Sequence, residues 1–153
     1  MQLTRFTDFS FRVLIYLGRN PERLATIDEI AAAYRISRNH LMKVVHRLGA
    51  SGYIQTVRGK GGGMRLARPA ERISIGDVAR DTEDNMDIVE CFSSDFRECA
   101  LLPSCVLKSA LVEARKNFLA TLDGYRLSDL LGRGRASQGQ SAVVRLVQRP
   151  RKR

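Results

Sequence analysis

Long hydrophobic runs are missing from this sequence. No stretch of about 18 apolar residues occurs, so we expect no transmembrane helix. The first residues also lack the pattern of a secretory signal, because Arg5, Asp8 and Arg12 interrupt them with charge. We therefore expect a cytoplasmic protein, in which thiols stay reduced. A chain of 153 residues can bury enough surface to fold without disulfides, which predicts one compact domain or a small domain with an extension.

Cysteine is scarce and is confined to one short stretch. The three cysteines are Cys91, Cys99 and Cys105. An odd number of thiols cannot all pair within one chain, which argues against a disulfide framework. Structural cysteines usually behave as small apolar residues of a core, whereas thiolates gathered in a polar loop suit iron–sulfur clusters, zinc or copper(I). The pattern therefore indicates a metal or redox site, and incidental cysteines in a loop are the alternative.

Acidic residues are absent from residues 133–153, which carry seven basic side chains. Residues 1–80 carry 14 basic and six acidic side chains, whereas residues 81–98 carry one basic and seven acidic. Basic segments at both ends of the chain favour binding to nucleic acid, and the acidic middle does not suit contact with phosphate. The last segment is rich in Gly, Ser, Gln and Arg, so we expect a disordered basic tail that either attracts phosphate or only aids solubility.

Apolar residues recur at helical spacing over residues 4–18, 27–34 and 38–51, which predicts three helices. Thr26 and Glu29 form a capping box at the start of the second helix, and Ser37 caps the third. The second and third helices are joined by a turn of only a few residues, which predicts a helix-turn-helix. The second helix of such a motif can enter a major groove. A plain three-helix bundle would show the same periodicity. The outward face of the third helix presents Arg38, Asn39, His40, Lys43 and Arg47.

A glycine-rich hairpin follows. Residues 53–57 and 64–67 read as strands, and the tip between them contains Arg58 and Lys60 among glycines. Such a tip can approach a phosphate or enter a minor groove, as a wing does, and a plain surface turn is the alternative. A phosphate-binding P-loop is excluded because Lys60 is followed by glycine and no helix begins there. The expected fold is mainly α with a small β-hairpin wing.

A short helix over residues 75–80 precedes the acidic stretch and the cysteines, and a longer helix begins after Ser104. The apolar residues of that longer helix recur at spacings of three and four. They are Leu107, Leu111, Ala114, Phe118 and Leu122. Such a stripe favours pairing with a second copy over packing within its own subunit. The expected division is a winged helix-turn-helix domain at 1–80, a cysteine loop at 81–105, a dimerisation helix with a short C-terminal helix at 106–132, and the tail at 133–153.

Several short segments occur in the order found in one family of regulators. They are residues 3–8, 37–40, 57–60, 62–66, 75–78 and 99–105. With them the chain resembles, over residues 1–131, the winged-helix iron–sulfur regulators, a family of transcription factors that includes IscR and nitric-oxide-sensing repressors. The resemblance implies a homodimer that binds a palindromic operator in double-stranded DNA and carries one iron–sulfur cluster per subunit.

The resemblance also implies a ligand set. Cys91, Cys99 and Cys105 would hold the cluster, with 4Fe–4S favoured over 2Fe–2S, and would leave one position for a further ligand. In the nitric-oxide-sensing members a carboxylate near the N-terminus of the other subunit fills this position, which corresponds here to Asp8 of the partner subunit. In IscR-like members a histidine does so, and this chain has Lys108 in the corresponding region.

Both histidines, His40 and His46, fall in the expected reading helix, which favours the carboxylate. An ordinary exposed carboxylate is the alternative for Asp8. The seven residues between Cys91 and Cys99 make this gap longer than the usual family spacing, a departure that loop entropy tolerates.

The function implied is that of a repressor, not an enzyme, which leaves its operator when nitric oxide reacts with the cluster. Its expected DNA contacts are Ser37, Asn39 and His40 to bases or phosphates, Arg38 and Lys43 to the backbone, and Arg58 and Lys60 in the minor groove. A thiol- or zinc-dependent regulator on the same scaffold is the first alternative. A redox enzyme or electron carrier is disfavoured, because the sequence has no substrate-pocket motif and no nucleophile–base pair.

Overall fold

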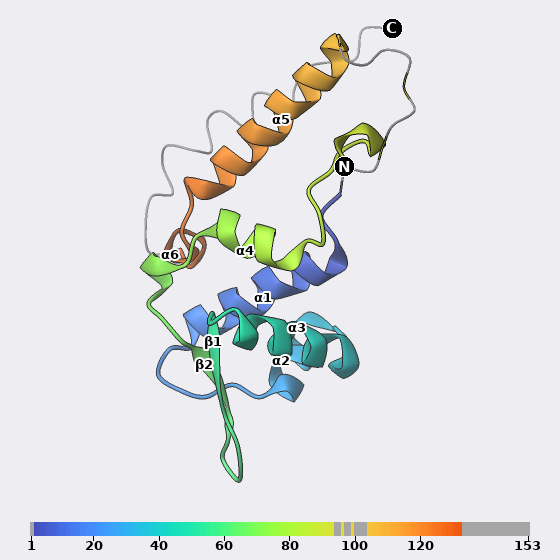
Figure 1. The fold of residues 1–153 in the computed structure, drawn as a ribbon. Coiled ribbons are helices and arrows are strands. Elements are labelled where there is room, and N and C mark those ends of the chain that lie inside the picture. The colour runs from blue at the N-terminus through green and yellow to red at the C-terminus, as the bar shows by residue number, and fades with distance from the viewer. Residues whose placement is uncertain (1, 94–95, 97–98, 100–103, 133–153) are drawn as a thin grey trace, which may run out of the picture.

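Three helices and a two-stranded hairpin form the first half of the chain in the computed structural model, which describes residues 2–93, 96, 99 and 104–132. These elements are α1 (Arg5–Arg19), α2 (Ile27–Tyr34), α3 (Arg38–Ala50), β1 (Ile54–Val57) and β2 (Gly63–Leu66). Figure 1 shows the hairpin extending away from the helices as a wing. The predicted fold class, mainly helical with a small β-hairpin, is confirmed.

Hydroxyl side chains cap the N-termini of α2 and α3, as the sequence predicts. At α2, Thr26 Oγ1 accepts the N–H of Glu29 at 3.2 Å, and Glu29 Oε2 accepts the N–H of Thr26 at 2.7 Å. This capping box satisfies amides that a helix N-terminus leaves free. The helix ends at Tyr34, and the following Arg35, whose φ of 54° lies in the left-handed region, turns the chain toward α3. The helix-turn-helix is therefore present.

The core lies between α1, α3 and the base of the hairpin. It is built from apolar residues that the helical spacing places on facing sides. Its buried members include Val13, Leu14, Leu17, Ile30, Leu41, Val44, Leu48, Tyr53, Met64, Ile73, Val78 and Leu127. A reading helix that buries one face in this core presents its opposite face to solvent.

The hairpin is fixed to the body at its base. Strands β1 and β2 pair antiparallel, from Ile54 opposite Leu66 to Val57 opposite Gly63. Two backbone hydrogen bonds of 3.0 and 2.8 Å join Met64 to Ala25, just before α2. The N–H of Tyr53 donates to the carbonyl of Leu48 in α3 at 2.9 Å. Because Tyr53 is still bonded to the helix that it leaves, the first strand begins one residue later than predicted.

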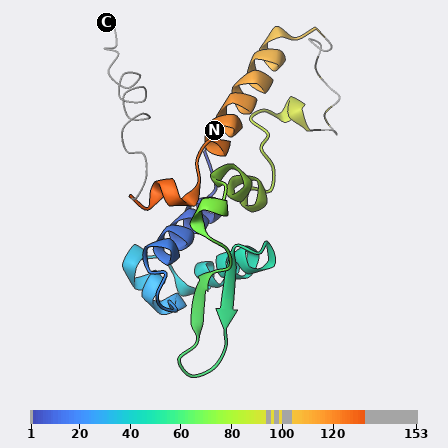
Figure 2. The same cartoon turned by 90° about the vertical axis from the view of Figure 1, so that its left-hand side faces the viewer.

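The second half carries a helix that leaves the body. Its elements are η1 (Ala70–Arg72), α4 (Ile75–Thr82), η2 (Glu90–Phe92), α5 (Val106–Asp123) and α6 (Leu127–Leu130). No residue of α5, all of which the structure describes, is buried. Figures 1 and 2 show α5 projecting on the side of the molecule opposite the hairpin. None of the described helices is long and apolar enough to cross a membrane.

Helix α5 is joined to α4 near its C-terminal end. Arg80 donates from Nη1 and Nη2 to the two carboxylate oxygens of Asp123 at 2.8 and 2.6 Å. These hydrogen bonds lower the pKa of Asp123 from its ordinary value of 3.8. A Cβ at Gly76 would collide with the same carboxylate, so a side chain there would force the carboxylate to move. The predicted tail at 133–153 lies outside the described residues.

Candidate functional site

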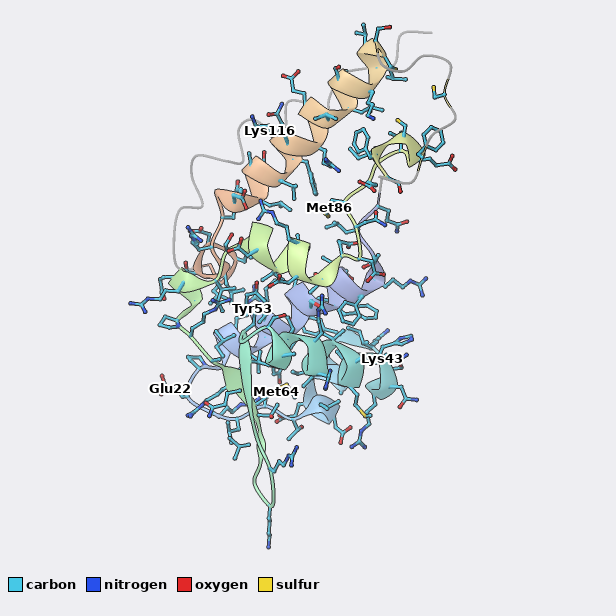
Figure 3. All side chains as sticks on the ribbon, in the orientation of Figure 1. Glu22, Lys43, Tyr53, Met64, Met86 and Lys116 are labelled. Atoms are coloured by element: carbon cyan, nitrogen blue, oxygen red, sulfur yellow. The ribbon has the colours of Figure 1, made fainter. Side chains whose placement is uncertain are left out.

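The outward face of α3 carries the residues predicted to read DNA. Ser37 begins this helix, and its Oγ accepts the N–H of His40 at 3.4 Å. The side chains that follow it on the first two turns are exposed. They include Arg38, Asn39, His40 and Lys43. Figure 3 shows Lys43 far from Met86 and Lys116, which lie in the other half of the molecule. The structure thus brings these predicted residues together on one accessible surface.

Two basic residues of α3 already have partners. Arg38 Nε lies 3.5 Å from Asp28 Oδ1, and both side chains are well exposed, so solvent weakens this ion pair. Arg47 Nε donates to the main-chain carbonyl of Asp81 at 2.8 Å. The Arg47 guanidinium therefore contacts α4, a contact that its place on the outward face of a helix did not predict.

The hairpin tip presents Arg58 and Lys60 to solvent. In the described part of the chain, neither takes part in an ion pair. Gly59 and Gly61 adopt φ values of 101° and 79°, which favour glycine, and the N–H of Gly62 donates to the carbonyl of Gly59 at 2.9 Å. The turn is consequently tight, and both of its cations are exposed.

The cysteines lie at the other end of the molecule. Cys91 belongs to η2, and Cys105 precedes α5, where its Sγ accepts the N–H of Lys108 at 3.4 Å. All three thiols are free and partly buried. Within residues 2–93, 96, 99 and 104–132, no three His, Cys, Asp or Glu side chains are gathered closely enough to hold a metal ion. The structure therefore does not bring the three sulfurs together.

The chemistry of this donor set still fits an iron–sulfur cluster. Three thiols are the soft ligands that such a cluster takes, and none of them is committed to a disulfide. The N–H of Lys108, in the first turn of α5, donates to the Cys105 sulfur. The assignment of these cysteines as ligands stays a prediction.

The fourth predicted ligand, Asp8, lies in the first turn of α1. Its Oδ2 accepts a hydrogen bond from Nε of Arg12 at 2.9 Å, and 48% of its side chain is exposed. It is therefore accessible to a second subunit. Its role as a ligand also stays a prediction.

Two contacts between elements, one of them beside Cys91, had no signal in the sequence. Arg115 on α5 donates to Asp87 Oδ1 at 3.0 Å and lies 4.7 Å from the ring centre of Phe92, beside Cys91. Tyr53 donates its hydroxyl proton to Asp81 Oδ2 at 2.6 Å. Each pair joins residues about 28 positions apart, a separation that periodicity cannot detect.

A helix-turn-helix with an exposed cationic reading helix and a basic glycine-rich hairpin defines the winged-helix class of DNA-binding proteins. The chain belongs to the Rrf2 family, described as iron-dependent transcriptional regulators, which it matches over residues 3–133. Membership of this family makes it a DNA-binding transcriptional regulator, and the resemblance drawn from the sequence motifs is confirmed at this level.

Relatives and solved structures agree with this assignment. The HTH-type transcriptional regulator NsrR of Bacillus subtilis (strain 168) is 52% identical over 132 residues, which cover 86% of this chain and 90% of that protein. The oxidised form of Staphylococcus aureus CymR has a TM-score of 0.70 and 25% identity, and the match covers 89% of this chain and 100% of that chain. IscR of T. potens has a TM-score of 0.69 and 23% identity, over 92% of this chain and 96% of that chain.

Proposed function

We propose that the protein is a homodimeric, cytoplasmic transcriptional repressor that senses nitric oxide through an iron–sulfur cluster and releases its operator when the cluster reacts. The observation that carries the proposal is the separation of the exposed cations from the cysteines. Cations of α3 and of the hairpin tip lie at one end, and at the other end Cys91 and Cys105 lie close to the unburied helix α5. Similarity to proteins named NsrR supports the same function.

The reading helix carries the sequence-specific contacts in this proposal. Ser37, Asn39 and His40 reach base edges or phosphates in the major groove, where side-chain donors can distinguish base pairs. Arg38 exchanges its exposed ion pair with Asp28 for a phosphate, because such a pair contributes little to stability. Lys43 holds the DNA backbone. Contacts to the DNA backbone fix the register of the protein on the duplex.

The hairpin tip enters the neighbouring minor groove. Arg58 and Lys60 are cations without ion-pair partners in the described chain, and a narrow minor groove concentrates negative potential. The glycines around them keep the tip thin. Arg58 and Lys60 therefore add electrostatic affinity and favour operators with a narrow groove beside each half-site.

A second copy of the chain covers α5. Val106 is 82% exposed and Leu107 is 65% exposed, an unfavourable state for large apolar side chains unless another surface removes them from water. Pairing of this helix with its symmetry mate produces a two-fold dimer, which matches a palindromic operator with half-sites about 34 Å apart. Residues 1–80 then bind DNA, residues 81–105 hold the cluster, and residues 106–132 form the dimer.

Cys91, Cys99 and Cys105 would hold the cluster, and Asp8 of the partner subunit would supply an oxygen ligand. A 4Fe–4S cluster is favoured, with 2Fe–2S as the alternative. When bound, the cluster supplies iron that reacts with nitric oxide. A carboxylate oxygen is a hard ligand on a soft centre, so Asp8 would be the ligand held least tightly.

Release of Asp8 does not leave a charge unpaired. Arg12 lies one turn along α1 and already donates to the Asp8 carboxylate at 2.9 Å. A carboxylate with this alternative partner can leave the other subunit at low energetic cost. A ligand shared between subunits would couple the cluster to the spacing of the two reading helices, on which operator affinity depends.

The test is oxygen-free purification followed by absorption spectroscopy, metal analysis and gel shift on the same sample. We expect a brown protein that contains iron, lacks zinc and retards a palindromic duplex. A colourless zinc protein that retards the duplex would support the thiol- or zinc-dependent alternative. A brown protein that fails to retard any duplex would contradict the repressor proposal.

A further inference from the structure

The last turn of α4 contacts both DNA-facing elements through one residue. The carboxylate Oδ2 of Asp81 accepts the hydroxyl proton of Tyr53 at 2.6 Å, and its main-chain carbonyl accepts Nε of Arg47 at 2.8 Å. Tyr53 immediately precedes β1, and Arg47 lies in the last turns of α3. Asp81 is therefore bonded to the base of the hairpin and to the reading helix at once.

The bond to Tyr53 is held in a protected environment. The Tyr53 residue is 1% exposed, and the guanidinium of Arg68 lies 4.5 Å from its ring centre. Burial raises the pKa of Tyr53, and the hydrogen bond to Asp81 raises it further, so the phenol stays a proton donor at neutral pH. Hydrogen bonds from a neutral donor to a carboxylate are stronger than those between neutral groups.

The next two residues attach the same turn to α1. The hydroxyls of Thr82 and Thr7 are hydrogen-bonded at 3.0 Å in a buried position. Glu83 Oε1 accepts the N–H of Thr4 at 2.8 Å, just before α1 begins. The chain then continues into the acidic stretch that leads to Cys91. The anchor of both DNA-facing elements is thus fixed to the body and adjoins the cysteine segment.

We propose that Asp81 is a positioning residue for DNA recognition, which holds the reading helix and the hairpin at one relative position. The inference rests on the proposed function, because it assumes that both elements contact the same operator. Base contacts require placement within about 0.5 Å, whereas attraction to phosphate tolerates larger displacements. Loss of the Tyr53–Asp81 bond should therefore weaken operator binding more than binding to unrelated DNA.

The experiment compares two duplexes by fluorescence anisotropy. One is a palindromic duplex selected by the wild-type protein from a random library, and the other is an unrelated duplex of equal length. For Tyr53→Phe and for Asp81→Ala we expect the ratio of the two affinities to fall about tenfold. Asp81→Asn keeps a side-chain oxygen that can accept the Tyr53 proton, so its ratio of operator affinity to unrelated-duplex affinity should stay close to that of the wild type. Stoichiometric titration corrects every value for the fraction of active protein.

Tyr16→Phe is the matched control. It also removes a tyrosine hydroxyl with a hydrogen bond, here from Arg23 at 3.2 Å, but on α1. Its affinity ratio should equal that of the wild type. Unchanged ratios in Tyr53→Phe and Asp81→Ala would overturn the positioning role and leave the proposed function standing. A wild-type protein that selects no duplex would contradict both.

Discussion

The hairpin tip should account for a measurable share of the salt dependence of operator binding. Each phosphate neutralised by a cation contributes about 0.9 to the slope of log affinity against log salt. A homodimer presents two tips, so Arg58→Ala should reduce the magnitude of this slope by about 2, and Lys60→Ala should act similarly. Arg58 is exposed and has no ion pair in the described chain, so its loss should change the free energy of unfolding by less than about 0.5 kcal/mol.

Lys116→Ala separates this local effect from a general loss of charge. Lys116 is an exposed cation on α5, and Figure 3 shows it in the half of the molecule away from the hairpin. Anisotropy titrations at four salt concentrations should give it the wild-type slope. Equal slopes for Arg58→Ala and the wild type would refute the role of the wing, as would an equal reduction in Lys116→Ala.

Further predictions concern the metal, the dimer and acid stability. Cys105→Ser should remove most of the iron measured after oxygen-free purification, while circular dichroism stays that of a folded protein; iron content equal to the wild type would exclude Cys105 as a ligand. Leu107→Asp should yield monomers in sedimentation analysis that circular dichroism shows to be folded, because Leu107 is largely exposed within its own subunit; an intact dimer would contradict pairing through α5. Arg80 lowers the pKa of Asp123, so their ion pair stabilises the fold above pH 3.8 and is lost as the pH falls through the lower folded value. Arg80→Ala should therefore lower Tm at neutral pH, and the difference from the wild type should vanish in acid when unfolding is followed by circular dichroism.

The helices were predictable because their signals are local. Thr26 and Ser37 lie at helix starts where a hydroxyl can accept a free amide, and the structure has helices beginning at the next residue in both cases. The hairpin was equally predictable from the glycines around Lys60. Cys105 was not predictable as a helix cap, because sulfur is a weak acceptor and cysteine is not among the residues favoured there.

The contacts that connect the elements could not be predicted. Tyr53 and Asp81 give no periodic or motif signal, and the Tyr53 hydroxyl finds its partner only after α3, β1 and α4 have packed. Arg47 shows the same limit. Its position on the outward face of α3 suggested a contact with DNA, whereas its guanidinium contacts α4. The spacing of Cys91, Cys99 and Cys105 does not determine whether their sulfurs meet, and within the described residues the structure does not bring them together.

The most direct test of the central claim follows the cluster and the DNA in one sample. Nitric oxide is added stepwise, without oxygen, to the iron-loaded dimer bound to a fluorescent operator, while absorption and anisotropy are recorded together. We predict that cluster absorption and bound DNA fall over the same additions, with operator affinity lowered by at least about fivefold at the end. Loss of cluster absorption with anisotropy unchanged would contradict the account.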